Sequence, residues 1–121
     1  MVCLINNKFN MLRESEFVKI RVTVPRGEVA EKVRQVLGEA GAGVQGNYDN
    51  CSFSYPVVGR FRPLAGANPA IGSVGKLEEV EEEMIEMLCH KDKVEEVIAA
   101  LKKAHPYEEP AIDIIPRLEV G

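Results

Sequence analysis

The two halves of this chain each combine a strand pattern with a helix pattern, and this repetition limits the folds open to it. Apolar and polar residues alternate over 18–24, which is typical of a half-buried strand. From Glu28 the apolar period becomes that of a helix, which is expected to end at Gly41 and Gly43. A shift of 65 positions aligns the apolar stripes of two helices, pairing Val29 with Val94, Val33 with Ile98 and Val36 with Leu101.

Three further strands and one long excursion complete the expected elements. The strands are predicted at 51–57, at about 80–89 and at 111–118. Asp92 is predicted to cap the second helix, with Glu95 as its capping-box partner. Glycines and prolines punctuate residues 59–79, which are expected to form a hairpin or a long loop.

This order of elements predicts an α+β, ferredoxin-like β-α-β-β-α-β fold, with an antiparallel sheet and two helices on one face. Pro56 and Pro116 fall in the predicted second and fourth strands. Proline is tolerated chiefly on edge strands, and the ferredoxin-like strand order 4-1-3-2 places these two strands at the edges. Residues 15–121 are expected to form this single domain. Residues 1–14 are interpreted as an N-terminal extension outside the core, with disorder as one option and Met11 as an alternative start.

Composition excludes several classes of function. The 121 residues carry a net charge of −4 with no basic run, which disfavours nucleic-acid binding. No long apolar segment predicts a signal peptide or membrane span. Cys3, Cys51 and Cys89 form no CxxC pair, so reduced thiols in the cytoplasm are expected. Cys51 and Cys89 are both predicted on buried strand faces.

The sheet face away from the helices is expected to carry charges of both signs. Lys19 and Arg21 on the first strand would face Glu82 and Glu86 on the third, and opposite charges on neighbouring strands add a little stability. Two interpretations stay open, a solvated face and a subunit interface.

Several apparent motifs carry no chemistry. Residues 41–46 match GxGxxG, but they follow a helix instead of opening one, so they are interpreted as a helix end and a turn. No nucleophilic triad is evident, and His90 is interpreted as a solvated loop residue.

Two polar segments remain as candidate binding sites. The first is 46–53, which contains Asn47, Tyr48 and Cys51 at a strand entry. The second is the corner 105–110, where two prolines stiffen the backbone; it contains His105, Tyr107, Glu108 and Glu109. Both segments can also simply turn the chain. They are expected at opposite edges of the sheet, so that one subunit's corner would meet the loop of a neighbour in a ring.

These segments also carry a family resemblance. Residues 41–53, 59–63, 66–69 and 105–111 strongly resemble the inserted domain of YqfO-like proteins in the Nif-three-like (dinuclear-metal-centre, hexameric) family. The resemblance spans about Phe17 to Leu118. It implies a fold similar to the CutA and PII proteins, which are ferredoxin-like trimers.

The resemblance stops at the accessory module. Family members hold two metals with residues from domains that flank the insertion, and this sequence has only His90 and His105 as histidines. Metallohydrolase activity is therefore not expected. The leading hypothesis is a non-enzymatic, cytoplasmic homotrimer without a cofactor, binding a small molecule or a protein near its subunit boundaries. The alternatives are a divalent metal-binding protein that uses His105 and nearby carboxylates, and a scaffold that trimerises another protein.

Overall fold

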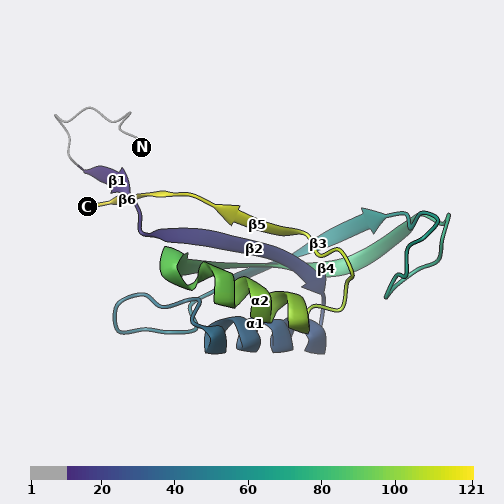
Figure 1. Ribbon diagram of the computed structural model, residues 1–121, viewed down its shortest axis with the longest axis horizontal. Helices are drawn as coiled ribbons and strands as arrows, with labels where there is room; N and C mark the ends of the chain where they lie inside the picture. The colour runs from purple at the N-terminus through teal and green to yellow at the C-terminus, as the bar shows by residue number, and fades with distance from the viewer. Residues whose placement is uncertain (1–10) are drawn as a thin grey trace.

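The computed structural model describes residues 11–121, in which four strands form one antiparallel sheet covered on one face by two helices (Figure 1). The main elements are β2 (Phe17–Pro25), α1 (Glu28–Ala40), β3 (Phe53–Phe61), β4 (Glu78–His90), η1 (Lys91–Lys93), α2 (Val94–Ala104) and β5 (Ile112–Ile115). The sheet order β3-β4-β2-β5 confirms the predicted ferredoxin-like order.

The core lies between the sheet and the helices. Every second residue of β2 is buried, and so are three alternate residues of β4, because successive strand side chains point to opposite faces. The helices contribute residues spaced three or four positions apart, which share one helix face. The buried apolar set includes Val18, Ile20, Val22, Val24, Ala30, Val33, Leu37, Ile85, Met87, Cys89, Val97 and Leu101.

The predicted C-terminal end of α1 is confirmed, but the predicted N-terminal cap of α2 is not. Gly41 ends α1 with a left-handed φ of 115°, and the N–H of Ala42 donates to the carbonyl of Leu37, as predicted for a glycine cap. The cap expected at Asp92 is wrong. The N–H of Asp92 instead donates to Nδ1 of His90 at 3.1 Å. The His90 side chain therefore caps the 3-10 turn η1 and is not a solvated loop residue.

The fourth strand is shorter than predicted. Pro56 lies in the edge strand β3, as expected, but Pro116 follows β5 and interrupts the predicted strand 111–118. After this break, β6 (Leu118–Val120) pairs with β1 (Leu12–Glu14) as a separate two-stranded ribbon. Of the proposed extension 1–14, residues 12–14 form β1, and residues 1–10 lie outside the described range, where the proposal stays a prediction.

The glycine-rich segment closes a long hairpin. β3 pairs with β4 from Phe53↔Glu86 to Phe61↔Glu78, and residues 62–77 connect the two strands. Figure 1 shows the far ends of β3 and β4 extending beyond the helices. The hairpin interpretation of residues 59–79 is therefore confirmed.

Candidate functional site

The loop that joins α1 to β3 is pinned at its base by Gly43. The N–H of Gly43 donates to the carbonyl of Leu88 at 2.7 Å, and its carbonyl accepts from the N–H of Cys51 at 2.9 Å. Within the loop, Gln45 and Tyr48 exchange two backbone hydrogen bonds. Tyr48 is consequently held at the tip of the loop with 75% of its surface exposed.

Cys51 differs from its prediction. It precedes β3 and is only half-buried, so its assignment to a buried strand face is wrong. The reason is that the N–H of Cys51 bonds to Gly43 in the loop instead of joining the ladder with β4. Cys51 lines a shallow pocket of about 230 Å³ between the loop and the open face of the sheet, together with Gln45, Phe53, Lys19, Glu86 and Arg117.

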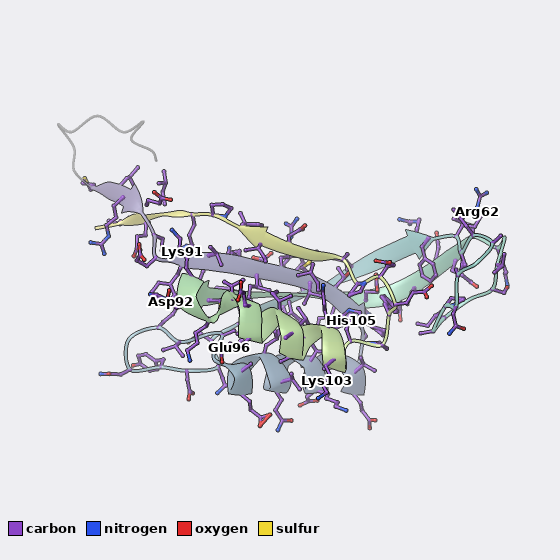
Figure 2. The ribbon with its side chains drawn as sticks, viewed as in Figure 1. Arg62, Lys91, Asp92, Glu96, Lys103 and His105 are labelled. Carbon is purple, nitrogen blue, oxygen red and sulfur yellow. The ribbon has the colours of Figure 1, made fainter. Side chains whose placement is uncertain are left out.

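His105 is buried at the start of the corner between α2 and β5. Figure 2 shows it at the C-terminal end of α2, with Lys91 and Asp92 at the other end of this helix. Its Nε2 lies 2.8 Å from the carbonyl oxygen of Thr23, and its Nδ1 lies 3.1 Å from the N–H of Tyr107. A carbonyl only accepts, so Nε2 carries the hydrogen and Nδ1 is the acceptor. Both ring nitrogens are therefore engaged.

Tyr107 closes the corner over a buried carboxylate. Its hydroxyl donates to Oε2 of Glu82 at 2.7 Å, and its ring lies beside those of Phe61 and His105. Glu82 is only 6% exposed. A side chain at Gly59 would overlap Oε1 of Glu82, so this glycine provides the space for the carboxylate.

The two glutamates of the corner differ in their surroundings. Oε1 of Glu108 accepts from the N–H of Asn68 at 2.9 Å, which ties the corner to the 62–77 segment. Glu109 is exposed. The corner is thus attached at three places, to β2 through His105, to β4 through Tyr107 and to the hairpin loop through Glu108.

The environment of Tyr107 predicts a loss of stability in alkaline solution. Burial, and then the hydrogen bond to and charge of Glu82, raise the pKa of the Tyr107 phenol above its ordinary value of 10.0. The folded protein therefore keeps this proton where the unfolded chain loses it, and the stabilisation is complete below about pH 10 and lost as the pH rises further. Tyr107→Phe should flatten this loss in urea unfolding measured between about pH 8 and 11. Tyr48→Phe, in an exposed side chain, is the control, and equal pH slopes in all three proteins would contradict the assignment.

The structure does not bring the two predicted segments together. The loop with Asn47, Tyr48 and Cys51 lies at one end of the domain, and the corner with His105 and Tyr107 lies at the other (Figure 1). Sequence reasoning also missed the partners of the corner, which are Thr23, Phe61, Asn68 and Glu82. One sequence feature could have indicated that Glu82 is buried. Gly59, which has no side chain, lies diagonally opposite Glu82 on β3.

The open face of the sheet carries its charges in pairs. Lys19 lies 3.2 Å from Glu86, as expected, but Arg21 pairs with Asp113 of β5 at 3.1 Å. The expected pairing of Glu82 with a cation across this face is wrong, because Glu82 is covered by Tyr107. The hydroxyl of Tyr55 also donates to Glu86, and this bond, followed by Lys19, lowers the pKa of the Glu86 carboxyl.

Among residues 11–121, no three His, Cys, Asp or Glu side chains lie close enough together to hold a metal ion. In that range no helix is both long and apolar enough to cross a membrane.

Comparison with known proteins identifies relatives, although no family model matches the sequence. A protein named GTP cyclohydrolase 1 type 2 homolog from Bacillus subtilis (strain 168) is 50% identical over 98 residues, covering 81% of this chain and 26% of the relative. A protein of the same name from Mycobacterium tuberculosis is 50% identical over 93 residues, covering 77% and 24%. The chain thus spans about a quarter of the length of these relatives.

Solved structures agree in fold. CutA, the periplasmic divalent cation tolerance protein of Archaeoglobus fulgidus, matches with a TM-score of 0.62 and 25% identity, over 84% of this chain and 83% of its own. The domain is therefore a CutA-like ferredoxin-fold module. A Bacillus cereus protein related to NIF3 matches with a TM-score of 0.72 and 40% identity, over 91% of this chain and 28% of its own. The chain is related to one segment of the Nif-three-like, YqfO-like proteins.

Proposed function

We propose that this chain is a non-enzymatic binding module that forms a homotrimer and binds a small molecule or a protein partner near its subunit boundaries. The observation that carries this proposal is the separation of the two polar segments at opposite ends of one sheet. A neighbouring subunit is the simplest way to bring a corner and a loop together. The relationship to CutA-like folds supports the same arrangement.

The uncovered surface of the sheet supports assembly. Phe53 is 72% exposed and Tyr55 is 42% exposed on the face away from the helices. β3 and β5 are the two edge strands, and an unpaired edge presents backbone N–H and C=O groups that another chain can bond. Aromatic side chains beside a free edge are typical of a protein interface.

The boundary would combine two kinds of binding group. The loop would supply Asn47, the exposed ring of Tyr48 and the Cys51 thiol, while the neighbour's corner would supply the carboxylates of Glu108 and Glu109. The lining of the pocket beside Cys51 includes the cationic side chains of Lys19 and Arg117 and the aromatic ring of Phe53. The ligand surface would therefore offer hydrogen bonds and charge around an aromatic contact, which is the usual composition of a small binding site.

The thiols bear on the compartment. Cys51 and Cys89 are free, and unpaired cysteines are the rule in a reducing environment. The free thiols support our proposal that the module is cytoplasmic.

Light scattering of the full chain tests the assembly. The expected mass is three times that of the 13.4 kDa chain. Phe53→Glu should reduce it to the monomer mass, because a charge would be buried at the boundary without a partner. Leu64→Glu, at a residue with 64% exposure in the hairpin loop, is the matched control and should leave the trimer intact. A monomeric wild-type chain, or equal effects of the two substitutions, would refute the proposal.

A further inference from the structure

The shallow pocket between the α1–β3 loop and the sheet is lined by residues from every strand level of the sheet. Phe53 of β3 is paired with Glu86 of β4, and Leu88 of β4 is paired with Lys19 of β2. Arg117, which follows the edge strand β5, completes the lining. One chain therefore supplies an aromatic ring, an apolar side chain and three charges around a volume of about 230 Å³.

The one carboxylate among the described residues of this lining, that of Glu86, is already satisfied. Its Oε1 lies 3.2 Å from Nζ of Lys19, and its Oε2 accepts from the hydroxyl of Tyr55. Lys19 and Glu86 thus balance each other, which leaves the guanidinium of Arg117 as a surplus positive charge in the pocket. The whole chain carries a net charge of −4, so this local surplus does not follow from a generally basic composition.

Arg117 is a half-buried cation that is held in place without a carboxylate partner. Its Nη1 donates to Oγ of Ser15 at 2.9 Å, and Ser15 is only 1% exposed. Within residues 11–121, no Asp or Glu forms an ion pair with Arg117. The Ser15 hydroxyl is the main cause of the lowered pKa of the Glu119 carboxyl, and Arg117 adds to it from a distance. Arg13, at 3.7 Å, is the cation that pairs with Glu119.

The donors of Arg117 and the rest of the lining define the kind of ligand that fits. A guanidinium has five N–H donors, and the described chain gives a side-chain partner to one of them. Two parallel donors of arginine match the oxygens of a carboxylate or phosphate. Phe53, which is 72% exposed, offers a ring for offset or edge contacts with another ring. The volume is below the range of about 300–1,000 Å³ that is usual for drug-sized ligands, so the pocket suits a single ring.

We propose that this pocket binds a small aromatic anion, a single ring that carries a carboxylate or phosphate group, with the acid group on Arg117 and the ring against Phe53. The inference deepens the proposed function and rests on it only in assigning a small molecule to this boundary. The pocket lies within one chain, so its formation does not require the trimer. In the trimer, the neighbour's corner would reach the ligand from the side opposite Arg117 and accept hydrogen bonds from it.

Titration of the isotope-labelled full chain, followed by NMR of its backbone amides, tests the proposal. The probes are benzoate and phenyl phosphate, and the controls are benzamide, which has the ring without the charge, and acetate, which has the charge without the ring. At least one of the two acids should cause saturable shifts at the amides of Gln45, Ser52 and Leu88. It should bind at least about tenfold more tightly than either control. Equal affinities for benzoate and benzamide, or no saturable shift with either acid at millimolar concentration, would overturn the proposal.

Substitutions then test the assigned contacts. Arg117→Gln should weaken the binding of the preferred acid at least about tenfold, and Arg117→Lys should recover only part of it, because lysine keeps the charge but not the paired donors. Arg60→Gln is the matched control, since it removes the same charge from an exposed arginine of β3 outside the pocket. Equal losses in Arg60→Gln and Arg117→Gln would show general attraction of anions and overturn the proposal. Unshifted β2 and β4 amides in the free Arg117→Gln protein check its fold, and Phe53→Leu, at an exposed position, should weaken binding independently.

The mass in solution separates this inference from the proposed function. Specific binding of the acid by a chain that light scattering shows to be a monomer would support the pocket and refute the trimer. A trimer that fails to bind either acid would keep the assembly and refute the pocket.

Discussion

Gly43→Ala is expected to destabilise the domain by at least about 3 kcal/mol. Gly43 has a φ of 81°, in the left-handed region that glycine tolerates. An added Cβ would lie 2.7 Å from Cε of Met87 and 2.8 and 2.9 Å from the backbone oxygen and nitrogen of Cys51. A methionine side chain can move, but the Cys51 backbone is hydrogen-bonded to Gly43 itself. The backbone strain of alanine at this φ and the steric overlap with the Cys51 backbone therefore both contribute to the loss of stability.

Gly46→Ala separates these two effects. Gly46 also has a positive φ, of 58°, but an added Cβ there would meet no atom within 4 Å. Only the conformational strain remains, and the expected loss is about 1 kcal/mol. Urea unfolding of the two variants and the wild type measures both losses from the transition midpoints. Similar losses for the two variants would show that the contacts around Gly43 do not matter.

The destabilisation expected in Gly43→Ala should also affect the candidate site. Gly43 follows α1 and is hydrogen-bonded to Leu88 of β4 and to Cys51, which precedes β3. These bonds hold the base of the loop that contains Asn47, Tyr48 and Cys51. Amides of residues 44–51 should therefore exchange faster in Gly43→Ala than in Gly46→Ala. A loop that is equally protected in both variants would mean that its shape is set elsewhere, for example by the Asn50 side chain over Gly38.

The fold could be predicted because its determinants are local. Alternation in β2 and the helical stripe of α1 are visible in single segments, and the core forms where these two periods meet. Cys51 and Pro116 were misplaced because the observed strands do not reach them. The N–H of Cys51 bonds to Gly43 in the loop, and Pro116 has no N–H with which to continue a ladder. Competition between such partners is a tertiary effect and leaves no periodic signal.

The candidate site could be located but not understood from the sequence. The stiff corner at 105–110 is evident from its prolines, yet the role of each side chain depends on distant residues. Glu82 looks like a surface charge until Tyr107 covers it and Gly59 makes room for it. His105 looks like a free ligand until Thr23 occupies one nitrogen and the Tyr107 backbone the other.

His105→Ala is the second substitution with a large expected effect. It leaves the carbonyl of Thr23 and the N–H of Tyr107 without their partners in a partly buried place, and it removes most of an imidazole from the packing. The expected loss is about 2–4 kcal/mol in the free energy of unfolding. His105→Asn keeps one donor and one acceptor, so it should recover part of this loss. His90→Ala, which removes a cap at a half-exposed position, should cost only about 1 kcal/mol.

Adding zinc to the same variants distinguishes a structural histidine from a metal ligand. A metal needs a free nitrogen lone pair, and Nδ1 of His105 already accepts from Tyr107. Zinc should therefore leave the Tm of the wild type unchanged, and the order of stability should stay wild type, His105→Asn, His105→Ala. A zinc-dependent rise in Tm that disappears in His105→Ala would reverse this conclusion. The corner would then open to bind metal, and the hydrogen bonds of His105 would describe only its metal-free state.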